Sequence, residues 1–321
     1  MFPVNSFGSL SVAAGTLDFR NTTSGGVALL PYIDQGNIYN QWNFNTTFWD
    51  TANSKNGNLT STNLAGWRCP SAPGGNGGGT PLTAGGTSCS SGADTNLVYI
   101  PSGTQIFGAG QPGISALTVY REGIADYIWT DGVRETTLNA YYSTNGGNRG
   151  GIFSDFAPSP ADAPSAVALA SIVKKVVVDA RISKVTDGLS NTTLLIEKAG
   201  RNNVWVLGQL QQPTSTIPTM GGAGGEVVIN SVVGGGGWAD CFNYEWTHGV
   251  LPAGYDNASN GGVCVVNCSN ANGAGLYSFH SGGGHALFGD GTVRFISANV
   301  DYVAFGACIT QSGSDPALAG N

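Results

Sequence analysis

Six cysteines and three histidines are the residues of this 321-residue chain whose types could support redox, metal or nucleophilic chemistry. An even number of cysteines permits up to three disulfides. Disulfides are the preferred interpretation, with a local pair of Cys69 and Cys89 and two pairs among the other four; buried free thiols are the alternative. A zinc finger needs close ligand pairs, and the glycine-rich spacing of His280 and His285 does not match one. The disulfide candidates are Cys69, Cys89, Cys241, Cys264, Cys268 and Cys308.

His280 and Asp290 could form a catalytic or metal-binding pair, because a histidine beside an aspartate is part of many hydrolytic sites. The chain has no Gly-x-Ser-x-Gly and no His-Glu-x-x-His sequence to accompany them. The preferred interpretation is structural: His280 hydrogen-bonds to the backbone at a hairpin, and Asp290-Gly291 forms its turn. We therefore predict no catalytic residues and a protein that is not an enzyme.

Asp187 and Asn191 offer side-chain oxygen atoms that could bind calcium, which prefers such ligands. The alternative is an Asp-Gly turn followed by side-chain hydrogen bonds to the backbone. Calcium is the one cofactor that the sequence suggests, and otherwise we expect none.

The composition argues against a nucleic-acid partner. Charged residues make up 10% of the chain and the formal net charge is −7, whereas an ordinary domain has about 25% charged residues. Binding to phosphates needs clustered Lys and Arg, of which the chain has 13 in total. A surface with little charge instead favours association. The seven Trp could form a sugar-binding face, although such residues are more often core or interface anchors.

The pattern of apolar and turn residues predicts an α+β fold in a single domain over residues 1–321. We expect a mostly antiparallel sheet, few short helices and long Gly/Asn-rich loops. A two-residue turn at Asp290-Gly291 joins the last two strands. Helices are expected at 27–44, 165–173 and 299–307, loops at 53–63 and 70–95, and strands at 97–100, 117–130, 176–182, 193–197, 203–210, 285–288 and 292–296.

Four stretches, in order, resemble the pilin-like and pseudopilin G-like proteins that are abundant in planctomycete-type bacteria. They are residues 29–40, Cys69-Pro-Ser71, residues 181–192 followed by 196–198, and the His-x9-Asp-Gly run from His280 to Gly291. The resemblance implies a pilin-like head with a structural role, in which His280, Asp290 and Gly291 form a structural motif. Calcium-bound loops in related pseudopilins also favour calcium at Asp187 and Asn191.

Proteins of that family begin with a basic leader and an apolar helix of about 20 residues, long enough to cross a bilayer. Met1-Phe-Pro resembles the sequence after this helix, so we expect no anchor helix and no membrane segment in the chain as given. The resulting hypothesis is a non-enzymatic structural subunit, extracellular or on the cell surface. It would self-assemble with copies of itself into a pilus-like filament or surface layer. A secreted or surface-displayed carbohydrate-binding module, with surface polysaccharide as its partner, is the alternative.

Overall fold

The computed structural model describes residues 6–7, 11–13, 16–18, 23–46, 48, 54–73, 82–84, 87–89, 95–100, 118–133, 150–153, 181–201, 204–211, 236–240, 243–254, 262–271 and 274–313. The helix predicted at 165–173, most of the strand predicted at 176–182 and Cys241 lie outside these residues.

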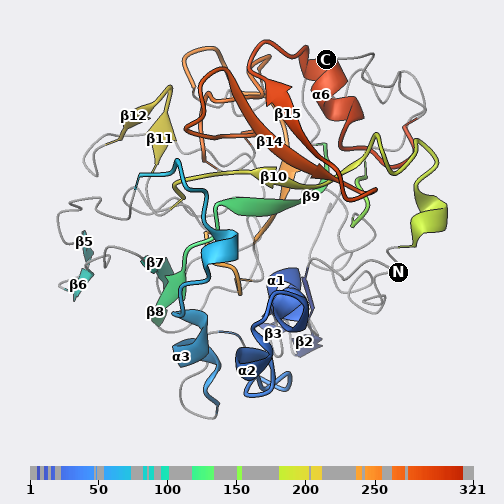
Figure 1. The fold of residues 1–321 in the computed structure, drawn as a ribbon. Coiled ribbons are helices and arrows are strands. Elements are labelled where there is room, and N and C mark those ends of the chain that lie inside the picture. Colours follow the sequence, from blue (N-terminus) through green and yellow to red (C-terminus); the bar gives the residue numbers. More distant parts are fainter. Residues whose placement is uncertain are drawn as a thin grey trace.

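A five-stranded sheet in the order β13-β9-β10-β14-β15 forms the centre of the described structure (Figure 1). Three of its four strand pairs are antiparallel, and β13 runs parallel to β9. The described helices are short, and the longest α-helix has six residues. These features confirm the predicted α+β class. The strands are β9 (Tyr127–Val133), β10 (Thr193–Glu197), β13 (Tyr244–Thr247), β14 (Gly283–Phe288) and β15 (Val293–Ser297).

Apolar side chains cover both faces of this sheet. Trp129 of β9 belongs to one buried cluster and its neighbour Ile128 to another. Successive side chains of a strand point to opposite faces, so the two clusters pack on the two sides of the sheet. The first cluster contains Val27 and Leu30 from the N-terminal helical segments, and the second contains Phe305 of α6 (Tyr302–Ala307).

The single helix predicted at residues 27–44 is wrong. The segment forms α1 (Gly25–Leu29), a 3-10 helix (Leu30–Tyr32) and α2 (Gly36–Tyr39). Pro31 lies in the first turn of the 3-10 helix, and Asp34 has a φ of 59°. A residue in the left-handed region cannot continue a right-handed helix, so the helix is interrupted between Tyr32 and Gly36.

Other elements surround the sheet, and several correct the sequence predictions. The loops expected at 53–63 and 70–95 contain α3 and the β5–β6 hairpin, and the strand expected at 117–130 is divided between β8 and β9. The strand expected at 203–210 is the β11–β12 hairpin. The elements are β1 (Ser6–Phe7), β2 (Ser11–Ala13), β3 (Thr16–Asp18), β4 (Thr23–Ser24), α3 (Asn56–Thr60), a 3-10 helix (Ala65–Trp67), β5 (Leu82–Ala84), β6 (Thr87–Cys89), β7 (Thr95–Ile100), β8 (Thr118–Gly123), a 3-10 helix (Ile182–Lys184), β11 (Trp205–Val206) and β12 (Gln209–Leu210).

The β14–β15 hairpin has the predicted strands but a longer turn. The Phe288 amide donates to the Thr292 carbonyl at 2.9 Å, which leaves residues 289–291 as a three-residue loop. Gly291 has a φ of 86°, the left-handed conformation that ends loops of this kind and favours glycine. The two-residue turn at Asp290-Gly291 is therefore wrong by one residue. Within the described part of the chain, no helix is long and apolar enough to cross a membrane.

Candidate functional site

A row of side chains crosses one face of the sheet and places Glu197 at its centre. Glu197 of β10 is paired with Tyr127 of β9. Ile196 is paired with Ala286, so Glu197 also lies opposite His285 of β14, which is paired with Phe295 of β15. Cross-strand partners present their side chains on the same face. The row brings a carboxylate and an imidazole together in the sheet, and the Glu197 side chain is only 1% exposed.

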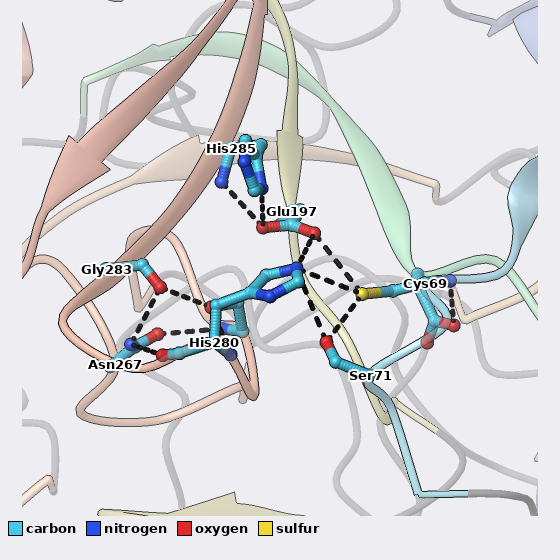
Figure 2. Close-up of polar contacts among 9 residues, drawn as sticks. Cys69, Ser71, Glu197, Asn267, His280, Gly283 and His285 are labelled. Carbon is cyan, nitrogen blue, oxygen red and sulfur yellow. Dashed lines mark hydrogen bonds and ion pairs between the residues drawn. The ribbon is translucent and has the colours of Figure 1, made fainter.

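The two carboxylate oxygens of Glu197 have different partners (Figure 2). Oε2 accepts a 2.6 Å hydrogen bond from the His285 amide and lies 3.3 Å from His285 Nδ1. Oε1 faces the other way, 3.3 Å from Cys69 Sγ and 3.3 Å from His280 Nε2. The carboxylate therefore connects the sheet to two residues that come from loops.

Asp126, just before β9, positions Cys69. Its Oδ2 accepts hydrogen bonds from the Cys69 amide at 2.8 Å and from Arg68 Nε at 3.1 Å. Its Oδ1 accepts from the Gly200 amide at 2.8 Å. Asp126 is fully buried, and burial raises its pKa, while the donors from Gly200, Cys69 and Arg68 act in the opposite direction. One carboxyl group thus ties the Cys69 segment to the chain that follows β10.

The loop before β14 is braced from both ends and positions His280. The His280 amide donates to Ser278 Oγ at 3.2 Å, and its carbonyl accepts from Asn267 Nδ2 at 3.4 Å. Asn267 also donates to the Gly283 carbonyl at 3.1 Å and accepts from the Ser278 amide at 2.8 Å. The ring of His280 is directed at Glu197 and Cys69 in Figure 2.

Cys69, Glu197 and His280 meet at a common point. Cys69 Sγ lies 3.7 Å from His280 Nε2, and the same nitrogen lies 3.3 Å from Glu197 Oε1. In a cysteine–histidine–carboxylate relay, the thiol and the carboxylate would use different ring nitrogens. Here both face Nε2. Ser71 Oγ completes the group, 3.0 Å from Cys69 Sγ and 3.4 Å from His280 Nε2.

The electrostatics of this cluster favour the neutral forms of Cys69 and Tyr127. Burial raises the pKa of Cys69, and the charge of Glu197 adds to the effect, while hydrogen bonds from Ser71 oppose it. Burial also raises the pKa of Tyr127 to about 12, with further contributions from Cys69, Glu197 and Asp126. The thiol is therefore protonated at neutral pH and can donate to Glu197 Oε1.

The predicted motif residues separate into two places. His280 joins the cluster with Cys69 and Glu197, in addition to its backbone hydrogen bonds. Asp290 lies at the tip of the β14–β15 hairpin, where its Oδ1 accepts from the Thr292 amide and hydroxyl at 2.9 and 2.7 Å. The structure does not bring His280 and Asp290 together as a pair. Gly291 serves the turn.

The loop with Asp187 and Asn191 is held by hydrogen bonds within the protein. Asp187 Oδ2 accepts from the Gly313 amide at 2.6 Å, and Asn191 Nδ2 donates to the Asp187 carbonyl at 2.8 Å. Gly188 between them has a φ of 95°, as expected for an Asp-Gly turn. These bonds give both residues a role in the loop. Calcium binding by Asp187 and Asn191 stays a prediction.

The cysteines differ from the predicted pairing. Cys264 and Cys268 form a disulfide. Cys69 and Cys308 are buried free thiols, so the predicted Cys69–Cys89 pair is wrong. The physical reason is that the Cys69 side chain turns toward the Glu197 carboxylate and the His280 ring, where it finds polar partners. Burial raises the pKa of Cys308 to about 12, which makes this thiol unreactive.

Sequence reasoning missed Glu197 and the role of Cys69. Cys69 and Glu197 are 128 positions apart, and Cys69 and His280 are 211 apart. No local spacing can show such a juxtaposition. A polar signal was present, however, because Glu197 and Lys198 directly follow the apolar residues 194–196, and a charged residue at the end of a buried strand needs a partner.

Comparison with known proteins shows the family. The family described as protein of unknown function DUF1559 (SBP_bac_10) matches residues 1–302. No curated protein and no solved structure matches the chain. The chain belongs to the DUF1559 family.

Proposed function

We propose that this protein is a non-enzymatic structural subunit that assembles with copies of itself into a filament or surface layer outside the cell. The observation that carries the proposal is the edge of the central sheet. Among the described strands, β15 pairs only with β14, and its Val293 and Phe295 side chains are 64% and 45% exposed. Such an edge presents backbone hydrogen-bonding groups and apolar side chains to another chain.

Two further observations support the proposal. Only 10% of the residues are charged, so little repulsion opposes contact between copies. The Cys264–Cys268 disulfide favours an oxidising compartment such as the cell exterior. The pilin-like character suggested by the four sequence stretches belongs to the same proposal.

The non-enzymatic part of the proposal rests on the polar cluster. Cys69 and Glu197 both face Nε2 of His280, which differs from a nucleophile relay, and burial raises the pKa of the thiol. A protonated, buried thiol is a weak nucleophile. We therefore propose that the cluster does not act as a cysteine nucleophile relay.

The alternative of a carbohydrate-binding module has less support. Sugar-binding sites use exposed aromatic rings, but Trp42, Trp67, Trp129 and Trp238 are at most 6% exposed. The Trp205 ring packs edge-on against Phe279 with centroids 5.0 Å apart. The four buried indoles therefore serve the core, and this arrangement favours a structural protein over a glycan receptor.

The test is self-association of the full chain. Light scattering and sedimentation over a concentration series, with negative-stain microscopy, should show assembly of the wild-type protein. Val293→Lys should weaken it by roughly tenfold or more, because burial of a valine is worth about 1.5–3 kcal/mol. Val263→Lys is the matched control, since Val263 is 54% exposed and lies outside the sheet. A wild-type chain that stays monomeric, or equal effects of both substitutions, would contradict the proposal.

A further inference from the structure

Three side-chain atoms of the kinds that ligate transition metals converge in the described structure: a thiol sulfur, a carboxylate oxygen and an imidazole nitrogen. They are Cys69 Sγ, Glu197 Oε1 and His280 Nε2, and they lie within 4.8 Å of one another. The three separations are 3.3 Å for sulfur to oxygen, 3.3 Å for oxygen to nitrogen and 3.7 Å for sulfur to nitrogen.

These separations lie within about 0.3 Å of those in a tetrahedral zinc site. Bonds of about 2.3 Å to sulfur and about 2.0–2.2 Å to nitrogen and oxygen place the ligand atoms roughly 3.3–3.6 Å apart at tetrahedral angles. An ion can therefore bond to all three atoms with little movement of the side chains. Ordinary hydrogen bonds join atoms in pairs and do not require three polar atoms to surround one common point.

Each of the three residues is also held by a second layer of contacts. The His285 amide and ring hold the far oxygen of Glu197, and the Asp126 carboxylate holds the Cys69 amide. Ser278 and Asn267 hold the backbone of His280. Partners of this kind orient metal ligands and raise affinity in known sites.

We propose that Cys69, Glu197 and His280 form a binding site for a single zinc-type divalent ion, with water or a small ligand in the fourth position. Binding breaks the S–H bond of Cys69 and forms a sulfur–metal bond, and the thiol proton is released to solvent. The charge of the ion then compensates both the thiolate and the buried carboxylate of Glu197.

The site has one open side. The Glu197 side chain is 1% exposed, whereas that of His280 is 32% exposed, so the ion reaches the cluster past the imidazole. Ser71 Oγ lies 3.0 Å from Cys69 Sγ and 3.4 Å from His280 Nε2, where it can hydrogen-bond to a metal-bound water. An open fourth position distinguishes this site from a closed structural zinc site with four protein ligands.

The test uses the full chain, stripped of metal with a chelator under anaerobic conditions that leave the Cys264–Cys268 disulfide intact, and titrated with Co²⁺. We expect one ion per chain, a thiolate-to-cobalt charge-transfer band in the near ultraviolet, and loss of that band when Zn²⁺ displaces the cobalt. The protein should be kept at a concentration where it is monomeric, so that the result does not depend on the proposed assembly. A wild-type chain that shows no charge-transfer band overturns the proposal.

Variants identify the ligands. Cys69→Ser should abolish the charge-transfer band, and His280→Ala and Glu197→Gln should each weaken Co²⁺ affinity by at least about tenfold. Cys308→Ser is the matched control, a second buried free thiol, and should keep the band, because Cys308 packs in the core cluster around Phe305 and is not one of the three ligands. Circular dichroism verifies folding, and if a ligand variant unfolds, the wild-type titration and the Cys308→Ser control decide the matter. A band that persists in folded Cys69→Ser also overturns the proposal.

Discussion

The backbone amide of His285 donates to Oε2 of Glu197 at 2.6 Å, from the strand directly beside it. The carboxylate of a residue in β10 is thus fixed by the main chain of β14, while its other oxygen faces two loop residues. The contact explains how the sheet can present a buried acid in a defined orientation. It also makes Glu197 a junction between the sheet, the Cys69 segment and the His280 loop.

Replacing Glu197 should therefore destabilise the fold. In Glu197→Gln, an NH2 donor replaces one of the two acceptor oxygens, so the side chain can no longer accept hydrogen bonds at both ends. The buried donor that loses its acceptor costs about 1–3 kcal/mol in the free energy of unfolding. Urea denaturation measures the effect. Asp34→Asn, at an exposed turn position, is the control and should change stability by less than about 0.5 kcal/mol. Equal stability of wild type and Glu197→Gln would contradict the role of Glu197 in joining the sheet to the Cys69 segment and the His280 loop.

Asp126→Ala should loosen two distant backbone groups together. The amides of Cys69 and Gly200 donate to different oxygens of the Asp126 carboxylate, each at 2.8 Å. We expect both amide protons to exchange with solvent faster in the variant, since alanine removes both acceptor oxygens. The amides of Val303 and Ala304, which donate to Asp301, are internal controls and should be unchanged. Faster exchange at only one of Cys69 and Gly200 would show that Asp126 does not join the two segments.

Gly284→Ala should be more harmful than an alanine elsewhere. A Cβ at Gly284 would overlap the Leu276 side chain and lie 3.0 Å from Glu197 Oε2, whereas a Cβ at Gly36 meets nothing within 4 Å. Crowding of this kind costs about 1–3 kcal/mol, while Gly36→Ala in α2 should be neutral or stabilising. Thermal unfolding of the two variants gives the comparison. If both change stability equally, the close approach at β14 carries no cost.

The contribution of Asp290, at the tip of the β14–β15 hairpin, to the stability of the fold should depend on pH. Hydrogen bonds from the Thr292 hydroxyl and amide lower the pKa of Asp290 below its ordinary value of 3.8. A group with a lowered folded pKa stabilises the fold above its unfolded pKa, and this contribution is lost as the pH falls through the folded value. In Thr292→Val, which lacks the hydroxyl, the pKa of Asp290 should rise toward 3.8. Titration of the carboxyl by NMR measures it, and an unchanged pKa would contradict the role of the hydroxyl.

Thiol mapping should distinguish four of the cysteines. In the native protein, Cys69 and Cys308 are buried and should react with an alkylating reagent only on unfolding. Cys264 and Cys268 should react only after reduction as well, because they are paired. Peptide mass spectrometry of native, unfolded and reduced samples gives the result. Alkylation of Cys264 in unfolded, unreduced protein would contradict the disulfide.

Local patterns predicted the parts of the fold in which neighbours in sequence are also neighbours in space. The alternation of residues 285–288 and 292–296 around Asp290-Gly291 indicated the β14–β15 hairpin, and the apolar run at 194–196 indicated β10. The helix expected at 27–44 was wrong because Asp34 adopts a left-handed conformation, which the apolar spacing does not report.

The cluster around Glu197 could not be predicted for a different reason. Its contacts depend on strand register and on loops tied down by Asp126 and Asn267, and these are properties of the folded chain. The resemblance pointed to His280 as a structural residue, but only the folded structure shows that the acid it meets is Glu197.

The distance along the chain between Cys69 and His280 also sets a timing for biosynthesis. The two residues are 211 positions apart, so at about 5–20 residues per second the thiol is made roughly 10–40 seconds before its imidazole partner. During that interval Cys69 has neither the burial nor the neighbours that later suppress its reactivity. The thiol therefore gains its folded neighbours only after the 128 residues to Glu197 and the 211 residues to His280 have been added to the chain.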